Sequence, residues 1–409
     1  MKIAIFSDCY LDLTGGIVSS INNQKEELER LGHTVYVFSS SYKKTPAEIK
    51  KLAQKRIYPV PSCRFFGRGL IPIARRPRIV ERWLLKNHPE IKDCDAFYVH
   101  YEAGCSIAGL RLGRELGVRT VQVMHGREDM GEQVLVPRGL RTIVAVLLDW
   151  FHSWYLPHPV KVHRDDYLAP TIARANMWTL MVNHANYADL VLAPSAHFRA
   201  KLKHYGVARE IKVLPNGVPD AYFVPDLQPR TLSPGEPLRL IWHSRISSEK
   251  SPLVFLAALR LLKIPYHVDI YGEGVEEKRA RRYADKHRLD VTFHGVAPFK
   301  NLYRRLLESH LDVLVSSGYD TFGMTLVEAE SAGVPTLYVD PDMDEIIPAH
   351  AGVRASANTP EAIAAAITDF YDHPDRLAKM SAELLRHRDQ YRISKIMEHN
   401  QEIFHGVAK

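Results

Sequence analysis

The chain has 409 residues, of which 46% are hydrophobic and 25% charged, a composition typical of a soluble globular protein. A chain of this length is too long to fold around one ordinary hydrophobic core, which predicts two domains. The longest apolar run, residues 143–148, is far shorter than the roughly 20 residues that a membrane-spanning helix needs. The four cysteines show no spacing typical of a disulfide framework or a zinc site. We therefore expect a cytoplasmic protein without a membrane-spanning helix.

The net charge of +7 is unevenly distributed. Residues 1–220 contain 31 lysines and arginines against 21 acids, whereas the rest of the chain contains 23 against 26. A basic half joined to a slightly acidic half predicts that only the first half meets an anionic surface.

The chain opens on KIAIFSD, a short apolar run that ends at Asp8 and predicts a buried strand rather than a signal peptide. Further strands are predicted from the runs TVYVFSS, AFYVHY, RTVQVMH and LVLAPS, with amphipathic helices between them at residues 17–31 and 105–117. Continuous apolar strands that alternate with helices are typical of a parallel sheet covered on both faces.

The same alternation restarts after the proline-rich segment 215–237, with strands predicted from LRLIWHSR, HVDIYGEG, VTFHG, LDVLVSS and PTLYVD. The fold class is therefore α/β, with two tandem doubly wound, Rossmann-like domains at residues 1–219 and 220–387. A helix at about 388–409 is expected to pack back on the first domain. Ligands of such sheets bind at the carboxyl ends of the strands, which places the expected site in a cleft between the domains.

Two glycine-bearing loops follow predicted strands. Gly15 and Gly16 stand in LDLTGGIVSS, and Gly272 and Gly274 stand in YGEGVEE. Glycines at such positions let the backbone approach a ligand at the start of a helix. Neither loop carries the full dinucleotide-binding fingerprint, so the motif alone is weak evidence.

Two cations follow the first strand of the second domain, in the segment HSRISSEKSP. Arg245 ends the predicted strand, and Lys250 opens the next helix. A planar guanidinium and a compact ammonium group at the carboxyl end of a strand suit a diphosphate. The alternative is that both are solvated surface charges.

Two acids lie eight positions apart in SGYDTFGMTLVEAESAGVP. Asp320 is expected in a loop, and Glu328 one turn into a helix that begins at Gly323. The free amides near Gly323, Met324 and Thr325 would form an anion site at the helix N-terminus, with a carboxylate on either side to accept hydrogen bonds from hydroxyl groups. The alternative is a loop acid and a helix acid with structural roles.

Together these motifs resemble the retaining glycosyltransferases of family 4, which have the GT-B fold. The family's two motif glutamates correspond to Asp320 and Glu328, its phosphate-binding cations to Arg245 and Lys250, and its PNGV linker to residues 215–218. The resemblance covers essentially the whole chain. It implies a nucleotide diphosphate sugar as the donor, with donor-binding residues Gly15, Gly16, Asn216, Gly272, Gly274, Phe322, Gly323, Met324, Thr325 and Glu328.

The resemblance also implies catalytic roles. Arg245 and Lys250 would neutralise the departing diphosphate, Asp320 would contact the donor sugar, and His125 in VMHGRED would lie beside the transferred sugar. A lone histidine is otherwise more often structural. Asp320 is one methylene shorter than the family's glutamate, which moves its oxygens back by about 1.5 Å and leaves the identity of the sugar open.

The implied mechanism retains the anomeric configuration without an enzymic nucleophile, and the two cations and the helix end stabilise the departing diphosphate. We expect no metal and no cofactor. The run DPDMDE at residues 340–345 begins like a calcium loop, but Glu345 and Ala351 stand where the turn glycine and the bidentate acid are needed.

Residues 63–87 mix seven basic residues and one acid with large apolar side chains, and residues 137–164 add Trp150, Phe151, Trp154 and Tyr155 beside scattered cations. This mixture fits the interface of an anionic membrane, although a solvated basic helix with ordinary core aromatics is an alternative. Single-stranded nucleic acid is not expected beside a nucleotide-sugar cleft. The candidate membrane and acceptor residues are Arg64, Phe65, Phe66, Arg68, Arg75, Arg76, Arg78, Arg82, Trp83, Glu102, Trp150 and Trp154.

Two segments resemble the bacterial branch of the family that glycosylates diacylglycerol: residues 3–40 and YVHYEAGCSIAGLRLGRELGVRTVQVMHG. That branch carries a glutamate in the position of Glu102. This resemblance implies transfer of a hexose, with glucose favoured, from a UDP-sugar to diacylglycerol on the inner face of the cell membrane. A polyprenyl-linked or soluble saccharide is the alternative acceptor. The sequence leaves the oligomeric state open.

Overall fold

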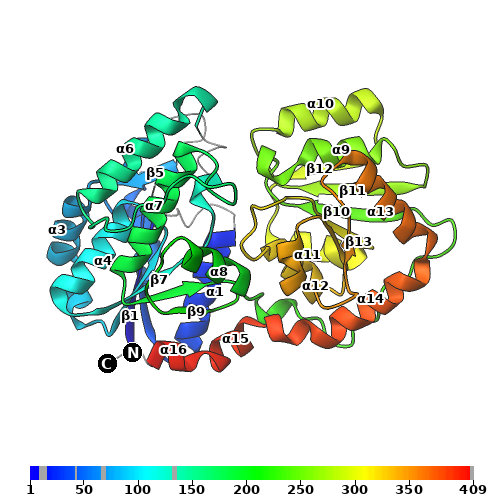
Figure 1. The fold of residues 1–409 in the computed structure, drawn as a ribbon. Coiled ribbons are helices and arrows are strands. Elements are labelled where there is room, and N and C mark those ends of the chain that lie inside the picture. Colours follow the sequence, from blue (N-terminus) through cyan, green and yellow to red (C-terminus); the bar gives the residue numbers. More distant parts are fainter. Residues whose placement is uncertain (9–15, 42–43, 66–70, 131–135, 406–409) are drawn as a thin grey trace. The chain divides into compact units, whose positions relative to one another are not determined.

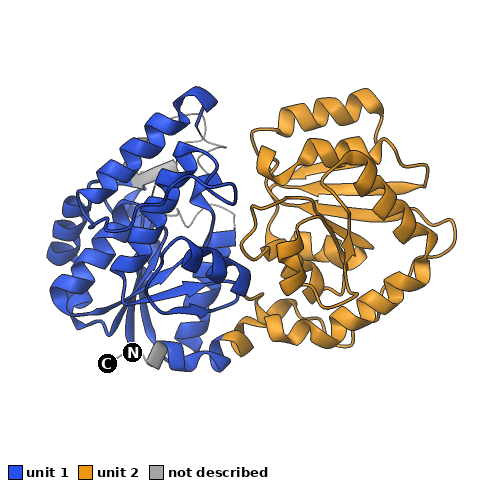
Figure 2. Ribbon diagram, in the orientation of Figure 1, with its two compact units in different colours: residues 1–215, 397–409 blue, residues 216–396 orange. Residues whose placement is uncertain are grey.

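The computed structural model describes residues 1–8, 16–41, 44–65, 71–130 and 136–405. It divides into two compact units, Met1–Pro215 with Met397–Lys409 (unit 1) and Asn216–Ile396 (unit 2), shown in Figure 2. This division lies four residues before the domain boundary proposed from the sequence. Of the predicted C-terminal helix, only the part from Met397 onward belongs to unit 1, where Glu398 pairs with Arg30 at 2.9 Å.

Unit 1 contains a seven-stranded parallel sheet in the order β3-β2-β1-β6-β7-β8-β9. All the strands predicted for this half are present. Strands β3 and β9 were not predicted, because each has only three residues, too few to form a recognisable sequence pattern. The strands are β1 (Lys2–Ser7), β2 (Thr34–Ser39), β3 (Ile57–Pro59), β6 (Ala96–His100), β7 (Arg119–Val123), β8 (Leu190–Ala193) and β9 (Ile211–Val213).

The helices of unit 1 lie on both faces of its sheet (Figure 1). They are α1 (Gly16–Arg30), α2 (Pro46–Gln54), α3 (Pro77–Asn87), α4 (Gly104–Leu116), α6 (Arg141–Ser153), α7 (Ile172–Tyr187) and α8 (Ala196–His204). The central strands are buried along their whole length, as in β6, because helices cover both faces. An antiparallel hairpin of β4 (Ser62–Phe65) and β5 (Ile71–Ala74) was not predicted, because its strands have only four residues each.

Unit 2 contains a six-stranded parallel sheet in the order β12-β11-β10-β13-β14-β15. Its strands are β10 (Leu238–His243), β11 (Tyr266–Tyr271), β12 (Val291–Gly295), β13 (Leu311–Leu314), β14 (Thr336–Tyr338) and β15 (Val353–Arg354). The helices are α9 (Pro252–Leu259), α10 (Glu277–His287), α11 (Phe299–Glu308), α12 (Met324–Ser331), α13 (Pro360–Asp372) and α14 (Pro374–His387). Helix α15 (Ile393–His399) then crosses from unit 2 into unit 1, to which α16 (Gln401–His405) belongs.

Both sheets are doubly wound, as predicted. In each sheet the chain builds outward in one direction from its first strand and then returns to the other side of that strand. The order therefore reverses between β1 and β6 in unit 1 and between β10 and β13 in unit 2. The crevice outside the carboxyl ends of these paired strands is where ligands of such folds bind. No helix within the described residues is long and apolar enough to cross a bilayer.

Candidate active site

The carboxyl end of β10 carries a buried histidine between two acids. His243 Nε2 lies 3.1 Å from Asp312 Oδ1 on β13, and His243 Nδ1 lies 3.3 Å from Glu328 Oε2 on α12. Burial lowers the pKa of His243, but the facing carboxylates of Asp312 and Glu328 outweigh it and raise the pKa to about 10. The imidazole is therefore a cation at neutral pH and holds Glu328, the predicted ribose ligand, at the switch point of unit 2.

The second predicted acid is paired with a predicted cation. Lys250 Nζ donates to Asp320 Oδ1 at 2.5 Å, and the Ser316 hydroxyl donates to the other carboxylate oxygen of Asp320. The side chains of Lys250 and Asp320 are only 9% and 11% exposed. The Lys250 ammonium also lies 5.1 Å from the centre of the Tyr319 ring. Asp320 thus has a fixed orientation and neutralises Lys250 when no ligand is bound.

Arg245 remains the accessible cation of this group. Its side chain is 56% exposed, its guanidinium donates to the Tyr319 hydroxyl, and it lies 3.2 Å from Glu249 Oε1. The Glu249 side chain is itself held by the Ser247 hydroxyl at 2.5 Å. Arg245 is therefore oriented from one side while its charge faces solvent, which suits the recognition of a phosphate.

The N-terminus of α12 is where the sequence predicts an anion site, and that role stays a prediction. Gly323 precedes the helix with φ of 76°, a left-handed conformation that side chains other than glycine rarely adopt. Within the described part of the chain, the buried Oγ1 of Thr325 and Oγ of Ser244 have no hydrogen-bond partner. Buried polar atoms normally find partners, so these two hydroxyl groups can each make one more hydrogen bond near the start of α12.

The glycines after β11 are explained by packing against the loop that carries Arg245. A Cβ atom on Gly272 would lie 2.2 Å from the Ser244 carbonyl oxygen, and one on Gly274 would lie 2.3 Å from the Ile246 carbonyl oxygen. The amide of Ile246 donates to the Glu273 carbonyl at 3.0 Å. The two glycines thus position the cationic loop, and direct contact with a donor remains a prediction.

The far end of α12 is held by two arginines, of which Arg388 is buried and Arg230 partly buried. Arg388 donates to the Ser331 carbonyl at 3.0 Å, Arg230 donates to the Ala332 carbonyl at 3.1 Å, and the Tyr303 hydroxyl donates to the Ser331 carbonyl. Cations at a helix C-terminus are favourable because the carbonyls there carry partial negative charge. Both ends of α12 are thereby defined, so the site at its N-terminus rests on a fixed helix.

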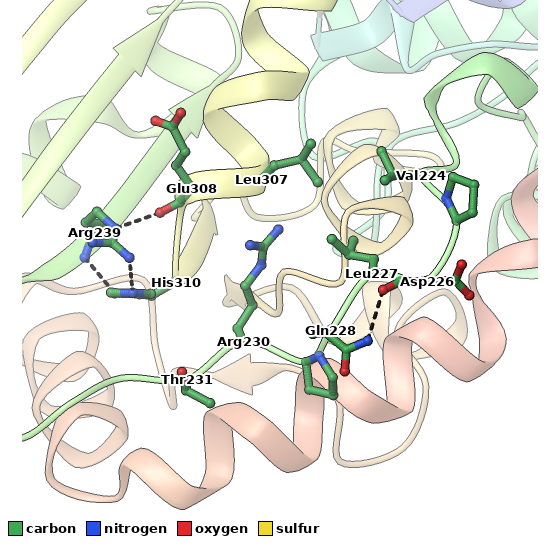
Figure 3. Close-up of a pocket in the computed structure, with 12 residues that line it drawn as sticks. Val224, Asp226, Leu227, Gln228, Arg230, Thr231, Arg239, Leu307, Glu308 and His310 are labelled. Carbon is green, nitrogen blue, oxygen red and sulfur yellow. Dashed lines mark hydrogen bonds between the residues drawn. The ribbon is translucent and has the colours of Figure 1, made fainter.

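Arg230 also lines a hollow on unit 2 between the segment 224–231 and the strands (Figure 3). Another arginine of the hollow, Arg239, donates to the Glu308 carbonyl at 2.6 Å and contacts His310 Nε2 at 2.6 Å. Arg239 is the second residue of β10, and His310 precedes β13. This hollow therefore lies at the amino ends of the strands, away from the candidate site.

In unit 1, Asp8 lies at the corresponding switch point and caps α4. Its carboxylate accepts hydrogen bonds from the amides of Ala103, Cys105 and Ser106 and, at 2.6 Å, from the Ser106 hydroxyl. Burial raises the pKa of Asp8 even though these donors favour the anion. The sequence analysis treated Asp8 only as the end of a strand, because the helix that it caps lies almost 100 positions away.

His125 follows β7 and stacks on His100 at the end of β6. His100 Nδ1 and His125 Nε2 lie 2.7 Å apart, within hydrogen-bonding distance. Burial lowers the pKa of His125 to about 4. His125 is therefore neutral at physiological pH and can act as a hydrogen-bond donor or acceptor. The family role implied by the sequence remains a prediction.

Glu102 follows β6 and is buried, with 8% of its surface exposed. Burial, followed by the nearby carboxylates of Glu128 and Asp8, holds the pKa of Glu102 well above its usual range. The preceding residue, Tyr101, has a φ of 82° and donates to Glu128 Oε2 at 2.8 Å. The sequence analysis grouped Glu102 with the acceptor and membrane residues. The structure buries it near Glu128 and Asp8 at the carboxyl end of the sheet, and an acceptor role stays a prediction.

The structure separates the other predicted membrane residues. Arg75, Arg76, Arg78 and Arg82 are exposed at the start of α3 and along it, and Trp150 and Trp154 are more than half exposed on and just after α6. Trp83 is instead partly buried, 4.9 Å from the His88 ring and against the core of unit 1. The side chains of Arg64 and Phe65, and residues Phe66 and Arg68, lie outside the described part.

The other predicted donor residues lie in different surroundings, and their contact with a donor stays a prediction. Phe322 is 3% exposed and packs in a core cluster with partly buried Met324. Asn216 lies in the linker, where the Val218 amide donates to the Tyr391 carbonyl. Gly16 begins α1, and Gly15 lies outside the described residues.

The run DPDMDE forms a short 3-10 turn, Pro341–Glu345, that begins after Asp340, whose side chain accepts from the Asp342 amide. Asp340 also accepts from the Gly318 amide at 2.6 Å. The described residues contain no group of three or more His, Cys, Asp or Glu side chains arranged to hold a metal ion.

Sequence reasoning missed His243, Asp312, Ser316 and Tyr319. His243 and Ser316 stand at strand ends beside motifs that were singled out, and that position was the available signal. Asp312 lies in the middle of an apolar strand and pairs with His243 across 69 positions of sequence, so no local pattern indicates it.

Comparison with known proteins gives the same architecture. Alpha-monoglucosyldiacylglycerol synthase of Streptococcus pneumoniae (strain ATCC BAA-255 / R6) is 24% identical over 354 residues, which span 82% of this chain and 70% of that protein. GDP-mannose-dependent alpha-(1-6)-phosphatidylinositol dimannoside mannosyltransferase of Mycobacterium tuberculosis (strain ATCC 25177 / H37Ra) is 28% identical over 275 residues, 65% of this chain and 62% of that protein.

Among solved structures, HepE of Anabaena in complex with UDP-glucose superposes with a TM-score of 0.68 at 15% identity, covering 99% of this chain and 100% of that one. Sucrose-phosphate synthase of Thermosynechococcus elongatus superposes with a TM-score of 0.68 at 15% identity, covering 99% of this chain and 98% of that one. The profile described as Glycosyltransferase Family 4 matches residues 14–222, and that of Glycosyl transferases group 1 matches residues 224–384. The chain therefore belongs to glycosyltransferase family 4 and has the GT-B fold.

Proposed function

We propose that this glycosyltransferase moves a hexose from a nucleotide diphosphate sugar to a membrane lipid, with retention of anomeric configuration. The observation that carries the proposal is the cluster at the switch point of unit 2. Three cationic side chains, His243, Arg245 and Lys250, converge there with the N-terminus of α12 and the unpartnered Thr325 hydroxyl. Such a cluster suits a diphosphate flanked by hydroxyl groups.

In the proposed reaction, the bond between the anomeric carbon and the diphosphate oxygen breaks. Arg245, Lys250 and the amides of α12 take up the charge that develops on the leaving oxygen. The acceptor hydroxyl adds to the same face of the sugar and transfers its proton to the departing phosphate. Glu328 holds the ribose hydroxyls, and Asp320, fixed by Ser316 and Lys250, accepts hydrogen bonds from the sugar. The scheme uses protein cations where other enzymes use a metal.

The choice of donor and acceptor rests on relatives. HepE is solved with UDP-glucose, and the pneumococcal relative is named a monoglucosyldiacylglycerol synthase. The mycobacterial relative is named for GDP-mannose and a phosphatidylinositol dimannoside, so both names contain a sugar-bearing lipid, with glucose in one and mannose in the other. We therefore favour UDP-glucose and diacylglycerol, at the inner face of the cell membrane. A polyprenyl-linked or soluble saccharide is the alternative acceptor.

The test is transfer of radioactive label from UDP-glucose into organic-extractable product, with vesicles that contain or lack diacylglycerol and with EDTA present. Label that enters lipid only with diacylglycerol supports the donor, the acceptor and metal independence together. Donor hydrolysis, or label in a water-soluble product, would support the transferase activity and would contradict the assignment of a lipid acceptor. Other nucleotide sugars, GDP-mannose first, are the controls for donor identity.

A further inference from the structure

Helix α6 carries a row of large apolar side chains on its exposed face. Ile143, Leu147, Trp150 and Trp154 are 57%, 52%, 53% and 59% exposed, and Leu140, just before the helix, is 51% exposed. Their spacing of three and four residues places them in one line along the helix. An amphipathic helix of a globular protein normally turns such a line towards the core, so its exposure requires an explanation.

The opposite face of α6 is fixed to unit 1. Ala145 packs with Ala173 and Met177 of α7, and His152 Nε2 lies 2.9 Å from His184 Nδ1, also on α7. Asp149 is the acid of α6, and it lies 3.0 Å from His158 Nδ1 with only 20% of its side chain exposed. The exposed row is therefore the outer face of a well-packed helix, and this face presents no acid.

A cationic helix lies beside this row. Arg111 of α4 donates to Glu81 Oε1 of α3 at 2.6 Å and to the Tyr155 carbonyl, just after α6, at 3.1 Å. This side chain holds α3 and the end of α6 on the same side of unit 1, where Figure 1 also shows them. Arg75 and Arg76 just before α3, and Arg78 and Arg82 on it, have exposed side chains, and these four are called the α3 arginines below.

We infer that α6 inserts this apolar row into the headgroup–acyl boundary of an anionic bilayer while the α3 arginines contact lipid phosphates. The helix has 13 residues, about 20 Å, so it lies in the plane of the membrane and does not cross it. Apolar side chains with tryptophans, flanked by cations and without acids, have the composition of an interfacial helix. The ring centres of Trp150 and Trp154 are 4.3 Å apart, which gives the row an aromatic end.

A second copy of the chain is the less favourable occupant. A two-fold contact through α6 would bring the α3 arginines of both copies towards the same interface, where like charges repel. The membrane inference deepens the proposed function, on which it rests for its biological purpose. The surface itself follows from α6 and α3 alone.

The first test compares vesicle binding of the full chain with that of Leu147→Gln/Trp150→Gln. Both positions are more than half exposed, so the folded state loses little packing. With vesicles of phosphatidylcholine and phosphatidylglycerol, we expect the partition coefficient to fall about 100-fold, since each buried apolar side chain is worth roughly tenfold or more. The matched control is Val275→Gln/Val296→Gln in unit 2, at positions 69% and 47% exposed, which should bind like the wild type. Unchanged partitioning of the α6 variant would overturn the inference.

The second test places α6 at the bilayer by fluorescence. Bromine-labelled lipids should quench the wild-type tryptophan emission, and Trp150→Phe/Trp154→Phe should lose most of that quenching while it still binds, because phenylalanine keeps the apolar surface. Equal quenching in the two proteins would contradict insertion of α6. A wild-type dimer in light scattering that Leu147→Gln/Trp150→Gln dissociates without loss of vesicle binding would assign the row to a second copy.

These outcomes are separable from failure of the proposed function. If wild-type protein binds vesicles through α6 but labels no lipid, the acceptor assignment fails and the membrane surface stands. If it labels diacylglycerol while vesicle binding is insensitive to the α6 substitutions, the function stands and the inference fails.

Discussion

Lys250 and Asp320 hold each other at 2.5 Å from opposite ends of a 70-residue stretch, so the proposed phosphate ligand and the proposed sugar ligand form one unit before any donor is bound. A bound diphosphate would compete with Asp320 for the ammonium group. Asp320 would then have free lone pairs for sugar hydroxyls. The pair thus couples occupation of the phosphate position to the state of the sugar position.

Removing the lysine alone should cost more stability than removing both partners. Lys250→Met leaves a carboxylate largely buried and unpaired, which typically costs about 3–5 kcal/mol, and Lys250→Met/Asp320→Asn should recover most of the loss. Urea unfolding followed by circular dichroism measures both. Lys379→Met, which breaks an exposed pair with Asp375, is the matched control and should show no measurable change. Equal losses in the single and double variants would show that the pair is not coupled.

Arg245→Ala should slow transfer with a small effect on donor binding. Loss of one preorganised cation at a developing oxyanion costs about 10²–10³ in kcat. Arg245→Lys should restore little of the rate, because a lysine cannot provide the planar fork that the Tyr319 hydroxyl and Glu249 orient. Steady-state and single-turnover kinetics with saturating donor separate the two effects. Wild-type turnover in Arg245→Ala would remove this residue from the site.

Glu328→Gln should weaken donor binding about tenfold or more, because a charged acceptor of hydroxyl hydrogen bonds is lost. Titration calorimetry with UDP measures the affinity without catalysis. A nearby control is Glu345→Gln, an exposed acid of the 3-10 turn Pro341–Glu345. If both variants bind UDP like the wild type, the ribose assignment of Glu328 is wrong.

The imidazolium of His243 predicts a loss of stability at alkaline pH. Its folded pKa of about 10 is raised above the ordinary value of 6.5, so its contribution is fully present below pH 6.5 and is lost as pH rises towards 10. The size of the shift corresponds to a contribution of at most about 5 kcal/mol. Urea unfolding at pH 6, 8 and 10 should show this fall in the wild type, and His243→Gln should show a flatter pH dependence. Parallel curves for the two proteins would rule out a charged His243.

The arginines of α3 should supply the salt-dependent part of vesicle binding. Arg75→Gln/Arg76→Gln/Arg78→Gln removes three exposed charges, each worth about 1 kcal/mol near an anionic surface. Co-sedimentation with anionic vesicles should weaken and become less sensitive to salt. Replacing three arginines of α10 by glutamine, at 279, 281 and 282, removes the same charge from unit 2 and is the control. Equal effects of the two triple variants would mean that only net charge matters.

Much of the fold followed from local pattern. Apolar runs such as KIAIFSD and LRLIWH predict buried strands because both faces of a parallel sheet are covered, and the intervening helices fix the doubly wound class. The helix that begins after Gly323 was also predicted locally, and the structure adds that this glycine has a left-handed conformation, which few other residues adopt. The family motifs then selected Arg245, Lys250, Asp320 and Glu328.

Pairing and exposure were decided by the tertiary structure. His243 contacts Asp312 only because β10 and β13 are neighbours in the sheet. The order of the strands cannot be predicted from any single segment of the sequence. The same holds for Asp8 and the helix that it caps. The sequence also shows the apolar row of α6, but a helix that buries such a row and one that exposes it have the same local pattern. Which face meets the core depends on what the rest of the chain packs against it, and here α7 takes the other face.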